Sequence, residues 1–175
     1  MNVQKVVVLL FGLSLCMGQN CQTPMAPTPQ QLASPIPEGI YSGDVRFRLT
    51  LRRDLSPTQE EIELPYTEAF GPDGLPLDEN NQPIRIGTVF DADYGGALAT
   101  LEVSGIRSVA NGIIVNYVVE MMFPTDSGPF SLSGEATDTY TLQGDAVEYR
   151  GTISVLGVKN GSTTSFTGSG IGLLE

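Results

Sequence analysis

The stretch Tyr41–Arg52 reads YSGDVRFRLTLR, and apolar and polar side chains alternate along most of its length. The apolar positions of this repeat are Tyr41, Val45, Phe47, Leu49 and Leu51. A period of two places successive side chains on opposite faces of a β-strand. The stretch therefore predicts a strand with one face in a core and the other face in water.

The same period continues to the end of the chain, with no competing helical pattern. Further strands are expected at about 61–70, 83–90, 97–109, 113–123, 130–142, 146–158 and 162–174. Together they predict an all-β domain, an eight-stranded antiparallel up-and-down (meander) barrel, with a two-sheet β-sandwich as the alternative. An outer-membrane barrel is a third arrangement, but the aromatic content of 7% is low for its two aromatic girdles.

Two Asn-Gly dipeptides predict hairpins of different register. The apolar positions on both sides of Asn111-Gly112 are odd-numbered, which requires a three-residue loop over 110–112 with Gly112 in the left-handed region. Around Asn160-Gly161, the odd-numbered Val155 should face the even-numbered Phe166. That pairing fits a two-residue type I′ turn.

Composition excludes several classes of function. The 175 residues include 20 acidic and 9 basic side chains, giving a net charge of −11, and there is no His and no Trp. Without His, neither a Ser-His-Asp group nor an imidazole metal site can form. The negative charge argues against binding nucleic acid, whose phosphates are neutralised by Lys and Arg. No pattern marks a catalytic pair of carboxylates, so we expect no enzymatic activity.

The first 21 residues are expected to be an export leader. The apolar run Val6–Leu15 is too short to cross a hydrocarbon core of about 30 Å as a helix. Both cysteines, Cys16 and Cys21, lie at the end of this leader. The arrangement resembles the leaders of bacterial lipoproteins, which implies acylation of Cys16 or Cys21 and anchoring on the periplasmic or extracellular face of a membrane. Ordinary cleavage near Gly18 and free secretion is the alternative.

Residues 22–38 contain five prolines and little apolar surface, which is typical of an extended spacer. A spacer behind an acylated cysteine would hold a folded domain away from the membrane, and an N-terminal stretch without a role is the alternative. We therefore expect a leader over 1–21, a tether over 22–38 and a single β-domain over 39–175.

The tripeptide Gly39-Ile40-Tyr41 resembles the Gly-X-Trp opening of lipocalin-like barrels, with Tyr41 in place of the Trp. The resemblance, together with the strand count, implies a carrier of a small lipophilic ligand inside the barrel. The side chains expected to line that interior are Phe47, Leu49, Tyr117, Val119, Tyr149 and Phe166.

Acidic residues are concentrated between Asp54 and Asp93, where Arg85 is the one basic side chain. Carboxylates in loops are the hard oxygen ligands that Ca²⁺ prefers. The residues expected to bind calcium are Asp73, Asp78, Asp91 and Asp93. Such a site would stabilise an extracellular β-domain, whereas solvated loop carboxylates are the simpler interpretation.

The strand expected at 113–123 has apolar side chains on both faces. Its outward set is Ile114, Val118 and Met122, and neighbouring strands add Leu98, Ile106, Leu156 and Val158. Contiguous exposed apolar surface commonly marks an interface. The first functional hypothesis is thus a non-catalytic structural or interaction module that uses this strip to bind a protein partner or another copy of the chain.

Overall fold

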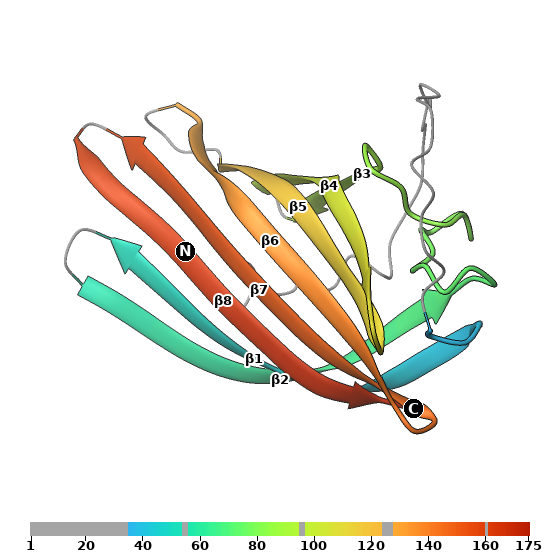
Figure 1. Ribbon diagram of the computed structural model, residues 1–175. Coiled ribbons are helices and arrows are strands. Elements are labelled where there is room, and N and C mark those ends of the chain that lie inside the picture. Colours follow the sequence, from blue (N-terminus) through green and yellow to red (C-terminus); the bar gives the residue numbers. More distant parts are fainter. Residues whose placement is uncertain (1–34, 54–55, 95–96, 124–127, 160) are drawn as a thin grey trace.

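Eight antiparallel β-strands make up the fold, which is a computed structural model (Figure 1). It describes residues 35–53, 56–94, 97–123, 128–159 and 161–175. The strands are β1 (Gly39–Arg53), β2 (Ser56–Phe70), β3 (Val89–Tyr94), β4 (Ala97–Val109), β5 (Gly112–Phe123), β6 (Phe130–Gln143), β7 (Ala146–Lys159) and β8 (Ser162–Leu174). Within the described ranges, no helix has the length and apolar character needed to cross a membrane. The predicted leader, Cys16, Cys21 and tether residues 22–34 lie outside these ranges.

The strands form one sheet in the order β2-β1-β8-β7-β6-β5-β4-β3. Strands that follow one another in the chain pair, except β2 and β3, and β1 also pairs with β8, so that Val45 lies opposite Gly172. The described parts of β2 and β3 do not pair with each other, and the curled sheet is a half-barrel that stays open between them (Figure 1). The all-β, antiparallel, eight-stranded prediction is confirmed, whereas the described residues form neither a completely closed barrel nor a second sheet.

The segment between β2 and β3 explains why the sheet stays open. A strand was expected at 83–90, but β3 begins at Val89 because Pro83 has no N–H for a ladder and Gly87 has a φ of 87°. The preceding residues make only isolated bridges, Phe70 to Pro76 and Leu77 to Pro83. This segment connects the two open edges without hydrogen-bonding them into a continuous ladder.

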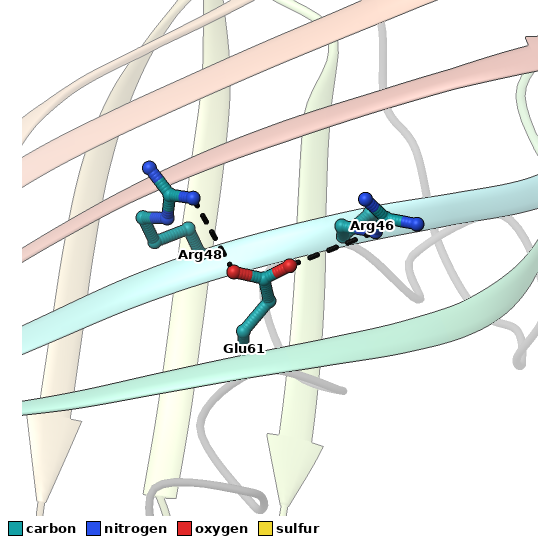
Figure 2. Close-up of polar contacts among 3 residues, drawn as sticks. All are labelled: Arg46, Arg48 and Glu61. Atoms are coloured by element: carbon teal, nitrogen blue, oxygen red, sulfur yellow. Dashed lines mark hydrogen bonds and ion pairs between the residues drawn. The ribbon is translucent and has the colours of Figure 1, made fainter.

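The apolar positions of the repeat face the interior, as predicted. Val45, Phe47 and Leu49 are at most 1% exposed. The outer face of the same hairpin carries charge, where Glu61 accepts from Arg48 at 3.3 Å and lies 3.6 Å from Arg46 (Figure 2). Because these groups are exposed, each ion pair should contribute less than about 1 kcal/mol.

Two predictions are wrong because β4 contains a β-bulge. The register shifts between Val103 and Gly105, so the residues after the shift exchange faces. Ile106, expected on the outer face, lies opposite Val115 and packs against the core. The predicted three-residue loop was needed to keep the odd-numbered apolar positions of both strands on the inner face. The extra residue of the bulge has that effect instead, and Val109 pairs with Gly112 across a two-residue turn. Gly112 consequently does not have the expected left-handed φ.

The second Asn-Gly hairpin has the predicted register. Val155 lies opposite Phe166, and Lys159 pairs with Ser162 across two residues. Gly161 has a φ of 79°, as a tight hairpin turn requires.

The end of the predicted tether packs on the domain. Ile36 is only 2% exposed, and the Tyr41 hydroxyl donates to the Pro37 carbonyl oxygen at 3.3 Å. The folded unit therefore includes residues ahead of Gly39, because burying one large apolar side chain offsets part of the cost of ordering them.

Candidate functional site: a cavity of tyrosines and carboxylates

A cavity of about 250 Å³ lies inside the half-barrel, on the side where the sheet is open. Its walls come from β1 to β7, with Ile40 the contribution of β1, and from the segment that joins β2 to β3. Four of the six tyrosines border it: Tyr66, Tyr117, Tyr140 and Tyr149. Apolar side chains complete the walls, among them Ile84, Phe90 and Leu101. The cavity thus combines apolar surface with a few polar groups, as small-molecule sites do.

Glu68 is the first polar centre of the cavity. Its Oε2 atom accepts hydrogen bonds from the hydroxyls of Tyr66 at 2.7 Å and Tyr140 at 2.9 Å. The two hydroxyls are 3.2 Å apart, and Glu68 is only 6% exposed. Because Tyr66 and Glu68 lie on β2 and Tyr140 lies on β6, these bonds tie the edge strand to the far wall across the interior.

Asp138 is the second polar centre. Its Oδ1 atom accepts from the Tyr149 hydroxyl at 2.9 Å. Gly151 lies opposite Asp138 on β7, and a Cβ there would collide with the Tyr149 hydroxyl and come within 3.0 Å of Asp138 Oδ1. The missing side chain at Gly151 therefore makes room for this hydrogen bond.

The tyrosine rings pack into one cluster between the two carboxyl groups. Tyr66 and Tyr149 are stacked with centroids 4.7 Å apart, and Tyr140 lies 5.5 Å from Tyr149. Phe90 meets Tyr117 edge-on at 6.4 Å. Ring contacts and hydroxyl bonds together fix the orientation of the aromatic faces.

Burial raises the pKa of both carboxyl groups. The pKa of Glu68 rises from 4.5 to about 7, chiefly through desolvation, which the hydrogen bonds from Tyr66 and Tyr140 partly oppose. Asp138 retains some exposure because it borders the cavity, but the deep position of its carboxyl group still raises its pKa to about 6. Burial also raises the pKa of all four tyrosines, so they remain hydroxyl donors at neutral pH.

Neither carboxyl group has a basic partner among the described residues. The ion pairs found there join Arg46 and Arg48 to Glu61, and Arg150 to Glu148, all with exposed arginines. No Lys or Arg of the described ranges borders the cavity. The interior charge is therefore balanced by protons or by a bound group, because an uncompensated buried carboxylate is costly.

Sequence reasoning missed Glu68 and Asp138, although a signal for them exists. Both are even-numbered on strands whose even positions face inward, Glu68 between Tyr66 and Phe70, and Asp138 just before Tyr140. A carboxylate at an inward position of a half-buried strand violates the two-residue pattern. Such a violation is a typical mark of a functional or strained site.

The residues predicted to line a ligand site divide into two groups. All six are buried inside the half-barrel, as the alternation predicted. Tyr117 and Tyr149 border the cavity. The others, Phe47, Leu49, Val119 and Phe166, pack in the core away from it.

Among the predicted calcium ligands, Asp73, Asp78 and Asp91 do not come together as a metal site, and the side chain of Asp93 lies outside the described ones. Asp73 accepts from the Leu75 N–H at 3.2 Å, and Asp78 accepts from two backbone N–H groups at 2.8 Å. Asp91 accepts from the Thr100 hydroxyl at 2.6 Å, and the backbone of Asp93 belongs to β3. In the described ranges, no three acidic or cysteine side chains are close enough to hold a metal ion.

The predicted interface strip is interrupted by charge. Val118 and Met122 are 45% and 47% exposed, whereas Ile114 is partly buried. Val118 lies between Glu102 and Glu135 on the neighbouring strands. Exposed apolar pairs remain where Met122 faces Leu98 and where Leu156 and Val158 follow each other on one face of β7.

Since the fold itself does not specify a function, any function has to be argued from the cavity and its residues. No protein-family model matches the chain, and neither a curated protein nor a solved structure matches it significantly.

Proposed function

We propose that this chain is an exported, non-catalytic protein that binds a small molecule in the cavity of its half-barrel. The observation that carries the proposal is the cavity of about 250 Å³, with apolar walls and convergent Tyr and carboxyl groups. Ligand pockets of proteins commonly measure about 300–1,000 Å³, so the ligand would be small. Binding inside a curled antiparallel sheet is the lipocalin-like mode that the opening tripeptide implied.

The non-catalytic part of the proposal rests on the chemistry of the polar groups. The chain has no His, and Glu68 and Asp138 both accept hydrogen bonds from tyrosine hydroxyls. Those bonds orient rings and hydroxyls around the space, which is what a binding site requires. Among the described residues that line the cavity, Thr67 is the one Ser, Thr or Cys, and its hydroxyl already forms a hydrogen bond with Ser42 on the outer face.

Filling the cavity is expected to weaken binding. The probe is 3,3-dimethyl-1-butanol, a small neutral alcohol with a bulky apolar end. In Leu101→Phe, the larger ring would occupy part of the cavity, and the affinity for this alcohol should fall about tenfold, or ~1.4 kcal/mol. Binding is measured through tyrosine fluorescence, because the chain has no Trp and four of its six tyrosines border the cavity.

Leu98→Phe is the matched control, because it makes the same substitution on the same strand at a side chain that is 50% exposed. Its affinity should equal that of the unmodified protein. Equal affinity in Leu101→Phe, with the fold retained by circular dichroism, would place binding elsewhere and contradict the proposed function.

The leader extends the proposal to the cell envelope. Acylation at Cys16 or Cys21 would tether the binding domain to a membrane surface, with the proline-rich stretch as spacer. We expect replacement of the acylated cysteine by serine to move the protein from the membrane fraction to the soluble fraction, and replacement of the other cysteine to have no effect. Mass spectrometry of the N-terminal peptide identifies the acyl group; a soluble, unacylated wild-type protein would instead indicate secretion.

A structural or interaction module remains a second candidate, supported by the exposed pair Leu98 and Met122. If this pair mediates self-association, Met122→Glu should lower the association constant at least about tenfold, since a buried unpaired charge is costly. Light scattering across a concentration series measures the change. Thr163→Glu, at an exposed position on β8, is the control. A wild-type domain that stays monomeric throughout the series would rule out self-association.

A further inference from the structure

We propose that the ligand of this cavity is a small organic ammonium ion, with the charged nitrogen beside the tyrosine cluster and the two carboxyl groups and its apolar substituents against the walls. The inference rests on the proposed function and specifies its ligand class. It follows from three features of the cavity, which are its charge, its rings and its rim.

The charge of the cavity favours a cation. Glu68 and Asp138 both border the space, and no Lys or Arg of the described ranges does. Their hydrogen-bond partners are neutral tyrosine hydroxyls, which orient the carboxyl groups without cancelling a negative charge. A bound ammonium ion would supply the missing countercharge in an interior where Coulomb attraction is less screened than in water.

The rings of the cavity favour the same ligand. Tyr66, Tyr117, Tyr140 and Tyr149 all border the space, and Phe90 adds a fifth aromatic side chain. An aromatic face carries negative charge density and attracts a cation placed over it, more strongly when the pair is removed from water. Because the rings of Tyr66 and Tyr149 stack on each other, the cation would lie over the other ring faces that border the space, in the manner of the aromatic sites that bind quaternary ammonium groups.

The rim of the cavity would exclude anions. The rim residues are Asp78 and Glu79, which line the cavity with side chains that are partly exposed and exposed respectively, and the whole chain has a net charge of −11. This potential concentrates cations near the entrance and repels carboxylates and phosphates. A neutral ligand of the same shape would fill the space but would gain none of these interactions.

Three probes of similar shape separate the effect of the ligand's charge from the effect of its size. Choline carries a quaternary nitrogen where 3,3-dimethyl-1-butanol carries a carbon, and 3,3-dimethylbutanoate adds a negative charge instead. Titration of the unmodified protein at about pH 8 should give choline at least about tenfold higher affinity than the alcohol, with no detectable binding of the anion. Calorimetry and tyrosine fluorescence provide independent readouts.

The preference for choline should depend on pH. Three titratable groups lie around Glu68: Tyr66 on its own strand, and Tyr140 and Asp138 on β6. The other titratable groups that line the cavity are Tyr149 on β7, Tyr117 on β5 and the rim residues Asp78 and Glu79. The tyrosines stay neutral, so protonation of the two carboxyl groups removes the negative charge as the pH falls. The affinity ratio of choline to alcohol should therefore be smaller at about pH 4.5 than at pH 8, where both carboxyl groups are ionised, and the ratio left at low pH reflects the aromatic rings.

A substitution removes the same charge at constant pH. Glu68→Gln keeps an oxygen that accepts from Tyr66 and Tyr140, so the affinity for choline should fall about tenfold while that for the alcohol is unchanged. Glu61→Gln, on the outer face of the same strand, should leave both affinities unchanged.

The outcomes separate the two proposals. Binding of the alcohol as tightly as choline, or a ratio insensitive to both pH and Glu68→Gln, would overturn the ammonium inference while small-molecule binding stands. If none of the three probes binds and Leu101→Phe changes nothing, the proposed function itself fails. Should Glu68→Gln not fold, the pH dependence of the unmodified protein decides alone.

Discussion

Glu68→Gln is expected to remove most of the loss of stability that the domain shows between about pH 5 and pH 8. In the folded protein the pKa of Glu68 is about 7, compared with its ordinary value of 4.5. Between these values the folded state holds a proton that the unfolded chain has released, so the free energy of unfolding falls as the pH rises. A shift of this size corresponds to a loss on the order of 3 kcal/mol once the pH exceeds the folded pKa.

The neutral glutamine should avoid that loss because its side-chain oxygen can still accept from both tyrosine hydroxyls. A smaller dependence should remain below about pH 6, where Asp138 titrates from a folded pKa of about 6 toward its ordinary 3.8. Urea unfolding at several pH values measures the free energies directly.

Glu61→Gln is the control for this experiment, because Glu61 lies on the outer face of β2 and pairs with exposed arginines. Its pH dependence should match that of the unmodified protein. If the Glu68→Gln variant loses stability between about pH 5 and pH 7 as steeply as the wild type, the Glu68 carboxyl group is not the source of that loss.

Gly134→Ala is expected to destabilise the domain by about 3 kcal/mol or to prevent folding. Gly134 lies on the inner face of β6 opposite Val155 on β7. A Cβ there would overlap the Ser154 carbonyl oxygen and lie 2.8 Å from the Val155 Cα. Because both contacts are with backbone, two hydrogen-bonded strands would have to separate locally.

Gly105→Ala is the matched control within a strand. A Cβ at Gly105 would come no closer than 3.4 Å, to the Asn116 side-chain nitrogen, which can rotate away. Its stability should stay within about 1 kcal/mol of the wild type. If thermal unfolding shows the two variants equally stable, the close approach at Gly134 does not constrain the curl of the sheet.

Much of the fold could be predicted from the two-residue period alone. The period identified every strand except the third, and it assigned Val45, Phe47 and Leu49 to the interior, because one buried face imposes strict alternation. The third strand was misplaced because Pro83 and Gly87 interrupt a stretch that otherwise alternates. The bulge before Gly105 could not be predicted, because its one extra residue changes only whether odd-numbered or even-numbered positions face inward.

The candidate site was predictable only in part. Tyr117 and Tyr149 were assigned to the interior, and the inward parity of Glu68 and Asp138 was available in the sequence. That these side chains converge on one cavity could not be predicted from the sequence. Glu68 and Tyr140 are 72 residues apart and meet across the interior of the sheet, not along a ladder of paired strands. Strand pairing relates neighbours in a sheet, whereas contacts through the lumen depend on how far the sheet curls.

The sequence by itself determined which side chains face inward, since alternation is a local property of an extended backbone that one buried face enforces. Tertiary structure alone decided that the sheet stays open between β2 and β3, and that Glu68, Asp138 and four tyrosines surround one cavity there. The physical reason is that curl and closure arise from the packing of strands distant in the chain, where glycine gaps, a bulge and buried hydrogen bonds act together.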